Sequence, residues 1–160
     1  MRGIAHKLGD DINTDYIISG RYKFSITDPR ELAKHIFEDI IPNFSQKIKE
    51  GDFIVAGKNF GCGSSREQAP LAIKASGIKA VIAISFARIF YRNAINLGLM
   101  LIEADTSSIR DTDELEIDLE RNKIVDISQG IEIDIKPLPL LMQDILKAGG
   151  AIEYFKKHKI

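Results

Sequence analysis

The sequence predicts an α/β fold in which helices flank a mixed β-sheet. In the central third, three apolar runs typical of buried strands alternate with two helical patterns. The strands are expected over 52–57, 79–84 and 97–103, and the helices over 66–76 and 85–98. Strand–helix–strand order requires parallel neighbours joined by crossover helices. After Asp105 the residues alternate between polar and apolar with a period of two, which indicates antiparallel strands with one solvent-facing side.

Capping residues mark the boundaries of the expected helices. A helix over 28–40 begins after Asp28, with Pro29 at its first position. The next helix ends before Gly77, and Ser85 is expected to cap the one that follows.

Three antiparallel strands and a helical segment are expected in the last third of the chain. The strands fall over 114–120, 123–128 and 131–137, and residues 138–160 form one or two amphipathic helices broken at Gly149 and Gly150. The 160 residues suffice for one apolar core, so we expect a single domain over 1–160.

The composition excludes several classes of protein. Hydrophobic residues make up 44% of the chain and charged residues 28%, and 22 basic against 23 acidic residues leave a net charge of −1. This balance gives no bulk attraction to nucleic acid or to an anionic membrane, so neither is expected as a partner. The first residues lack the apolar run of a secretory signal, and no apolar run approaches the ~20 residues that cross a bilayer. We therefore expect a cytoplasmic protein.

The single cysteine limits the cofactors that this chain can hold. Cys62 has no second cysteine with which to form an internal disulfide, and it suits a reducing compartment. An iron–sulfur cluster or a structural zinc ion needs three or four ligands, whereas the three histidines are scattered at positions 6, 35 and 158. We expect no metal in this chain, and any metal chemistry would come from another chain.

The loop GKNFGCGSSREQAP, residues 57–70, is the least ordinary segment. It is not a phosphate-binding P-loop, because its lysine, Lys58, comes at the start of the motif rather than the end. It is not a dinucleotide-binding fingerprint, because Arg66 occupies the position of the third glycine. It does not match the GxSxG nucleophile elbow either, since Arg66 or Glu67 stands at the position of the last glycine.

Two interpretations of the loop stay open from the residues alone. Ser64 with Glu67, or Ser65 with Gln68, matches a capping box, so the serines could simply begin the helix. One cap suffices for one helix, however, and a spare hydroxyl beside Arg66 at a helix N-terminus suits a small carboxylic acid. No histidine lies nearby in the sequence, which makes a serine hydrolase the weaker idea.

Three segments carry a resemblance to a known family: GDDINTDYIISGRY (9–22), GKNFGCGSSREQAP (57–70) and SFARIFYRNAINLGL (85–99). In this order they resemble the small subunits of the isopropylmalate isomerase and homoaconitase family, the separate-chain relatives of the aconitase swivelling domain. The resemblance covers nearly the whole chain. It implies the compact swivelling β/β/α fold of aconitase domain 4. It also implies a hydro-lyase that dehydrates a malate-type di- or tricarboxylic acid and rehydrates it with the hydroxyl on the adjacent carbon.

The resemblance implies a role for each matching residue. Ser64 is the expected catalytic base, acting as an alkoxide on the carbon next to a carboxylate, and Ser65 and Arg66 bind the substrate carboxylate. Asp15 lies in the active-site wall, and Arg21 contacts the substrate or braces the loop beside it. The substrate hydroxyl leaves from a [4Fe–4S] cluster held by a large subunit, with which this chain forms a heterodimer or heterotetramer. Alone, the chain is expected to be inactive.

Substrate choice in the family depends on the loop after GRY, which here comprises Tyr22, Lys23, Phe24 and Ser25. Phe24 stands where relatives that act on homoaconitate place an arginine. An apolar side chain there favours isopropylmalate, an intermediate of leucine biosynthesis. Lys23 either faces solvent or reaches an acid group, so homoaconitate and dimethylmalate- or methylmalate-type acids remain alternatives. An anion- or partner-binding module without catalysis is the alternative from another class of protein.

Three further residues of the matching segments receive a structural interpretation. Cys62 is expected to be a small loop residue. Arg88 and Arg92, on the helix over 85–98, are expected in buried ion pairs or at an interface rather than in catalysis.

Overall fold

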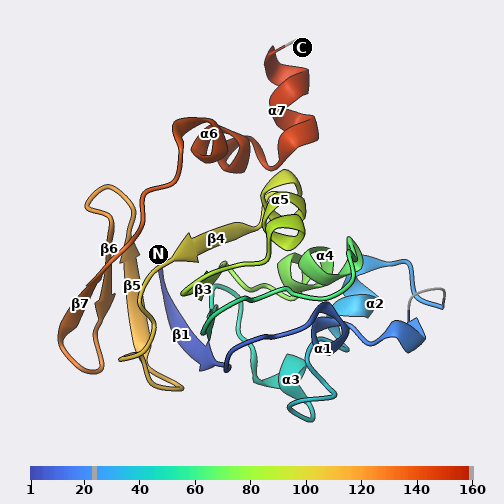
Figure 1. Ribbon diagram of the computed structural model, residues 1–160, viewed down its shortest axis with the longest axis horizontal. Helices are drawn as coiled ribbons and strands as arrows, with labels where there is room; N and C mark the ends of the chain where they lie inside the picture. The colour runs from blue at the N-terminus through green and yellow to red at the C-terminus, as the bar shows by residue number, and fades with distance from the viewer. Residues whose placement is uncertain (23–24, 159–160) are drawn as a thin grey trace.

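The fold is built on one curled, seven-stranded sheet, and the computed structural model describes residues 1–22 and 25–158 (Figure 1). The strands are β1 (Arg2–Lys7), β2 (Phe53–Ala56), β3 (Ala80–Ala83), β4 (Met100–Glu103), β5 (Glu114–Asp118), β6 (Lys123–Asp126) and β7 (Ile131–Asp134). Their order in the sheet is β4-β3-β2-β1-β5-β6-β7. β1 to β4 are parallel, and β5 to β7 continue the sheet as an antiparallel meander. The predicted mixed α/β sheet is confirmed.

The helices connect the parallel strands and follow the meander (Figure 1). They are α1 (Thr14–Ile17), α2 (Pro29–Ala33), α3 (Phe44–Lys47), α4 (Gln68–Ala75), α5 (Arg88–Asn96), α6 (Leu140–Ala148) and α7 (Ala151–His158), with a 3-10 turn over Gly20–Tyr22. Gly77 and Gly149 follow α4 and α6 with φ of +95° each, as predicted from their positions. In the part of the chain that the structure describes, no helix is long and apolar enough to cross a membrane.

The helix expected over 28–40 is much shorter than predicted. Its start is confirmed, because Asp28 Oδ1 accepts a hydrogen bond from the Arg30 N–H at 2.9 Å. Its end is wrong: α2 stops at Ala33, and Phe37 has a φ of +54° that no α-helix contains. Phe37 is fully buried, so packing of its ring outweighs the local helical pattern.

The parallel strands are buried on both faces, which explains their continuous apolar runs. Ile54 of β2 belongs to one core cluster together with Ile73 of α4. Its neighbour Val55 belongs to a second cluster, together with Ile117 of β5. The sheet therefore curls so that the meander covers the face of the parallel strands opposite to the helices.

β1, at the junction of the two halves, was not expected from the sequence. It pairs in parallel with β2 and antiparallel with β5. Of its six residues only Ala5 is fully buried, so it shows little apolar pattern. Gly3 permits the close approach of the neighbouring chain, since an added Cβ would lie 2.3 Å from the carbonyl oxygen of Gly51.

Candidate active site

The 57–70 loop leaves the carboxyl end of β2 and contacts the segments that leave β1 and β3. The Gly61 N–H donates to the Ile12 carbonyl at 2.8 Å, and the Phe60 N–H donates to the Ser85 carbonyl at 3.0 Å. The three segments that carry the family resemblance therefore meet at one place. That place is the carboxyl edge of neighbouring parallel strands, where α/β proteins bind their ligands.

Two glycines fix the path of the loop. Gly61 and Gly63 have φ of +85° and +91°, a conformation that side chains rarely adopt. A Cβ on Gly61 would lie 2.2 Å from Cγ of Phe90, and a Cβ on Gly63 would lie 2.5 Å from Oδ1 of Asn13. The backbone of the loop therefore packs closely against Phe90 of α5 on one side and against Asn13, the N-cap of α1, on the other.

Thr14 positions the backbone of Ser64. The Thr14 side chain is buried, and its Oγ1 donates to the Ser64 carbonyl at 2.8 Å. The Thr14 N–H donates to the Cys62 carbonyl at 2.8 Å, so one residue holds the loop at two points. Cys62 is half-buried and contributes its main chain to this contact.

Of the two interpretations left open for Ser64 and Ser65, the capping box is wrong. α4 begins at Gln68, after Glu67, and its N-terminus receives no side-chain hydrogen bond. The turn before the helix is closed by the backbone instead, since the Ala69 N–H donates to the Arg66 carbonyl at 3.2 Å. Both serines are exposed, and both line the cavity described below.

The predicted Ser85 cap on α5 is also wrong. α5 begins at Arg88, and its N-terminus has no side-chain cap. The Ser85 hydroxyl instead accepts a hydrogen bond from the Asn59 N–H at 2.8 Å. This serine therefore ties the entrance of α5 to the 57–70 loop.

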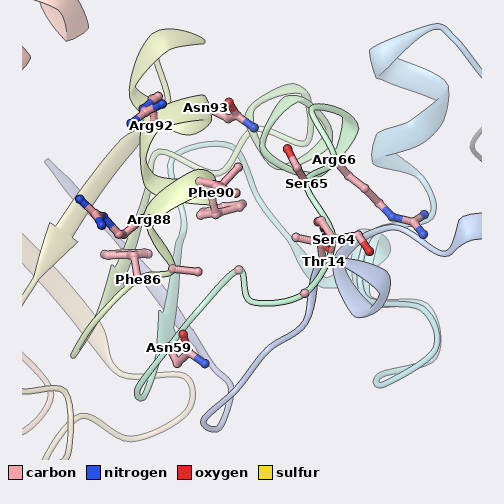
Figure 2. Close-up of a pocket in the computed structure, with 14 residues that line it drawn as sticks. Thr14, Asn59, Ser64, Ser65, Arg66, Phe86, Arg88, Phe90, Arg92 and Asn93 are labelled. Atoms are coloured by element: carbon pink, nitrogen blue, oxygen red, sulfur yellow. Dashed lines mark hydrogen bonds between the residues drawn. The ribbon is translucent and has the colours of Figure 1, made fainter.

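A cavity of about 700 Å³ separates the serine loop from α5 (Figure 2). Its lining comprises Thr14, Asn59, Gly61, Gly63, Ser64, Ser65, Arg66, Phe86, Ala87, Arg88, Ile89, Phe90, Arg92 and Asn93. Among the described residues that line it, three are arginines and none is acidic. The potential in this cavity therefore favours an anion.

Arg66 lies at one edge of the cavity and is held by Asp15. Its Nη2 lies 2.6 Å from Asp15 Oδ1, and its side chain is 17% exposed. The guanidinium also rests against the backbone of Gly20, where an added Cβ would lie 3.2 Å from Nη1. Asp15 accepts from one of the terminal nitrogens, and the planar guanidinium has five N–H donors. Donors therefore remain for a carboxylate.

The structure does not bring Arg21 into the cavity. Its Nη2 donates to Glu38 Oε1 and Asp39 Oδ1, each at 2.9 Å. The Tyr22 hydroxyl donates to the same Glu38 oxygen at 2.5 Å, and the Tyr22 ring stacks on His35 at 4.1 Å. Burial acts to raise the pKa of Glu38, but hydrogen bonds from Tyr22, His35 and Arg21 outweigh it and hold the pKa below its ordinary value. This arrangement favours bracing over substrate contact for Arg21.

The specificity loop is only partly described. Lys23 and Phe24 lie outside the described residues, so the interpretations given to them stay predictions. Ser25 is exposed, and its hydroxyl donates to the Arg21 carbonyl at 3.4 Å.

Sequence reasoning missed several residues that line the cavity. Asn93 occupies a position at helical spacing from Phe86 and Phe90, so a polar residue on an otherwise apolar helix face was the available signal. Asn59 lines the cavity but was not singled out. Of the two roles expected for Arg88 and Arg92, the buried ion pair is wrong because both residues are exposed, and a place at an interface stays a prediction.

The described part of the chain, residues 1–22 and 25–158, contains no group of three or more His, Cys, Asp or Glu side chains that could hold a metal ion. These residues do not fit an iron–sulfur cluster, which needs a set of thiolate ligands.

The fold and the site define a member of the aconitase superfamily. Residues 21–107 match the model of the aconitase C-terminal domain family, and the chain belongs to that family. Within it the chain belongs with the small subunits. It is 58% identical, over 99% of its length and 96% of the relative's, to 3-isopropylmalate dehydratase small subunit 2 of Archaeoglobus fulgidus. It is 56% identical, over 100% of its length and 94% of the relative's, to the methanogen homoaconitase small subunit of Methanocaldococcus jannaschii.

A solved structure supports the same placement. The crystal structure of 3-isopropylmalate dehydratase from Methanocaldococcus jannaschii superposes with a TM-score of 0.95 at 57% identity. The superposition covers 99% of this chain and 94% of that one. The swivelling-domain fold predicted from the resemblance is thereby confirmed.

Proposed function

We propose that this chain is the small subunit of a hydro-lyase that interconverts 2-isopropylmalate and 3-isopropylmalate by dehydration and rehydration. The names of most of its close relatives support this substrate. The observation that carries the proposal is a cavity with two exposed serines and three arginines and, among its described lining, no carboxylate. Such a lining suits a dicarboxylic acid that must lose a proton.

In this proposal Ser64 is the base. Its backbone is fixed by Thr14, and the residue is exposed and lines the cavity, which suits a base that takes a proton from the carbon next to the substrate carboxylate. The guanidinium of Arg66 binds that carboxylate through a pair of parallel N–H donors, and Ser65 donates a further hydrogen bond. Positive charge around the cavity stabilises the anionic base and the charge that develops on the substrate.

The proposal assigns the [4Fe–4S] cluster to a large subunit. The relatives are named small subunits, which implies a large-subunit partner. With one cysteine in its sequence, this chain lacks the ligands for a cluster of its own. The isolated chain is accordingly expected to be colourless and inactive, and the complex with its large subunit brown and active.

The test is turnover of the reconstituted pair with Ser64→Ala. Loss of a general base lowers kcat by about 10²–10⁴-fold, while KM changes little and the subunits still assemble. Ser65→Ala is the matched comparison, since Ser65 is also exposed and lines the same cavity, and its replacement is expected mainly to raise KM. If the assembled Ser64→Ala complex turned over substrate at the wild-type rate, the assignment of Ser64 as the base would be wrong.

Homoaconitase is the second candidate, because a relative of that name matches the whole chain at 56% identity. The reconstituted pair should be assayed with isopropylmalate and homoaconitate side by side. We expect kcat/KM to be higher for isopropylmalate, and the reverse order assigns the chain to homoaconitate.

A further inference from the structure

A second cavity lies on the other side of α5 from the serine loop, between this helix and the segment that leads into α6. Its volume is about 530 Å³, and we call it the outer groove. It is lined by Phe86, Arg88, Tyr91, Arg92, Ile95, Asn96, Glu103, Lys136, Pro137, Leu138, Pro139, Leu141, Met142 and Ile145. Phe86, Arg88 and Arg92 also line the serine cavity, and the roles proposed above use only the positive charge of the two arginines.

The outer groove carries excess positive charge. Arg88 and Arg92 lie four residues apart, on the same face of α5, and Figure 2 shows both side chains directed away from Ser64 and Ser65. Both are exposed, and within the described chain neither forms a salt bridge. The third cation, Lys136, lies 3.2 Å from Glu103, which is the only acidic residue among the described residues of the lining. Two arginines are therefore left for an acidic partner.

The same groove has an apolar wall. Leu141 is 55% exposed and borders the groove together with Leu138, Met142 and Ile145. Met142 lies beside it, with its Sδ 3.4 Å from the Tyr91 hydroxyl. A small inorganic anion would leave this wall uncovered, whereas a polypeptide with acidic and apolar side chains would cover the wall and meet both arginines.

The outer groove is continuous with the candidate active site. Phe86, Arg88 and Arg92 line both cavities, so a segment bound in the groove lies at the mouth of the serine cavity. An active site shared between two subunits needs their interface at that mouth. We infer that the outer groove receives an acidic and apolar segment of the large subunit. This inference rests on the proposed function, because it takes the large subunit as the partner.

The test measures the affinity of the purified large subunit for variants of this chain by isothermal titration at several salt concentrations. We expect Arg92→Glu to weaken association about 10- to 100-fold and to flatten its salt dependence. Leu141→Ser is expected to weaken association about tenfold, because it removes apolar area from the contact. Leu140→Ser is the matched control, because Leu140 is the neighbouring residue on α6, is 78% exposed and does not line the groove. The large subunit should bind this variant with the wild-type affinity.

Turnover separates docking from substrate binding. At saturating large subunit the Leu141→Ser complex is expected to keep the wild-type kcat and KM. If Leu141→Ser and Arg92→Glu both bind the large subunit as the wild type does, the inference is overturned while the proposed function stands. If Arg92→Glu raises KM without changing association, the arginine acts on the substrate and the inference is again overturned.

Two further outcomes have defined meanings. If the wild-type chain does not associate with the large subunit at all, the proposed function and the inference fall together. If the isolated chain self-associates and Leu141→Ser abolishes this, the groove belongs to a second copy of the chain and the inference is overturned.

Discussion

Arg66 shows how much of a binding role depends on contacts that a linear motif does not reveal. The motif places an arginine after two serines, and the structure adds Asp15 at one terminal nitrogen and the Gly20 backbone beneath the guanidinium. These contacts select one orientation of a long side chain before any ligand arrives. Arg66 is in this way preorganised, which reduces the entropy that binding would otherwise cost.

Arg66→Lys tests this interpretation. Lysine keeps the charge but loses the planar pair of donors, so we expect KM of the reconstituted enzyme to rise about 10- to 100-fold, as for loss of one charged hydrogen bond. The measurement is steady-state turnover, with Arg21→Lys as the comparison because Arg21 lies outside the cavity. A larger increase in KM for Arg21→Lys than for Arg66→Lys would reverse the two roles.

Gly61 offers a second test at the level of the residue. Gly61→Ala places a methyl group against the Phe90 ring in a backbone conformation with φ of +85°. Gly130→Ala is the matched control, since Gly130 has φ of +69° and nothing within 4 Å of an added Cβ. We expect Gly130→Ala to lower the free energy of unfolding by about 1–2 kcal/mol from backbone strain alone. Gly61→Ala should lower it by about 2–5 kcal/mol, because overpacking adds to the strain. Equal losses in denaturant unfolding would contradict the tight contact with Phe90.

At the level of the element, the alternation of polar and apolar residues predicted where the antiparallel strands lie, but it did not predict that a carboxyl side chain is buried among them. The period-two pattern of β6 places Asp126 on the same face as Ile124, and that face is buried. Asp126 is fully buried, and the Asp113 carboxyl lies close enough to affect its pKa. Gln129 Nε2 lies 2.7 Å from Asp113 Oδ2 and 3.0 Å from Asp126 Oδ2. A pattern of polar and apolar letters could not reveal a carboxyl pair, because the two partners come from different segments.

This pair makes stability depend on pH. Burial, and then the neighbouring Asp113 carboxyl, raise the pKa of Asp126 above its ordinary value. The folded state therefore binds the proton more tightly than the unfolded state. The stabilisation is present below the unfolded pKa and is lost as pH rises through the folded pKa of Asp126. The asparagine amide of Asp126→Asn mimics the protonated carboxyl and does not ionise. As pH rises through the folded pKa of Asp126, the free energy of unfolding should therefore fall less for this variant than for the wild type.

The measurement is the free energy of unfolding in urea across a pH series that begins near the ordinary pKa of an aspartate, about 3.9. Asp144→Asn, on the exposed side of α6, is the control and should follow the wild type. Parallel pH profiles for the wild type and Asp126→Asn would show that the pair does not share a proton.

The helix starts show the same limit of local patterns. Asp28 caps α2 as expected, because the capping contact lies within three residues. Ser64, Ser65 and Ser85 fit the capping pattern equally well, yet tertiary contacts move the helix starts past all three. Ser64, Ser65 and Arg66 could therefore be singled out from the sequence, while their immediate partners and the polar residues across the cavity could not.

At the level of the whole molecule, the mixed sheet was predictable and its central strand was not. The parallel strands show continuous apolar runs and the antiparallel strands alternate with a period of two, because in both halves side-chain burial defines the pattern. β1 joins the two halves mainly through backbone hydrogen bonds. Because these do not require apolar side chains, the sequence of Arg2–Lys7 shows little apolar pattern. The curl that brings the meander over the parallel strands likewise depends on where β1 lies.

Stability should be unevenly distributed over this architecture. β2 and β3 are fully buried, whereas α7 contributes no buried residue to either core cluster within Ala151–His158. We expect amide hydrogens of α7 to exchange through local opening, and those of β2 and β3 only through global unfolding. Hydrogen exchange followed by mass spectrometry checks this, and equal protection of α7 and β2 would contradict it.

The main-chain bonds that hold the serine loop have a consequence for divergence within the family. The contacts from Gly61 to Ile12, and from Phe60 to Ser85, join backbone atoms, so the hydrogen bonds themselves do not depend on which side chains surround them. The position of the candidate base Ser64 can thereby stay the same while residues around the loop are substituted. New substrates can then be acquired by altering neighbouring side chains alone. Relatives bearing two different enzyme names at 58% and 56% identity to this chain are the outcome that this constancy permits.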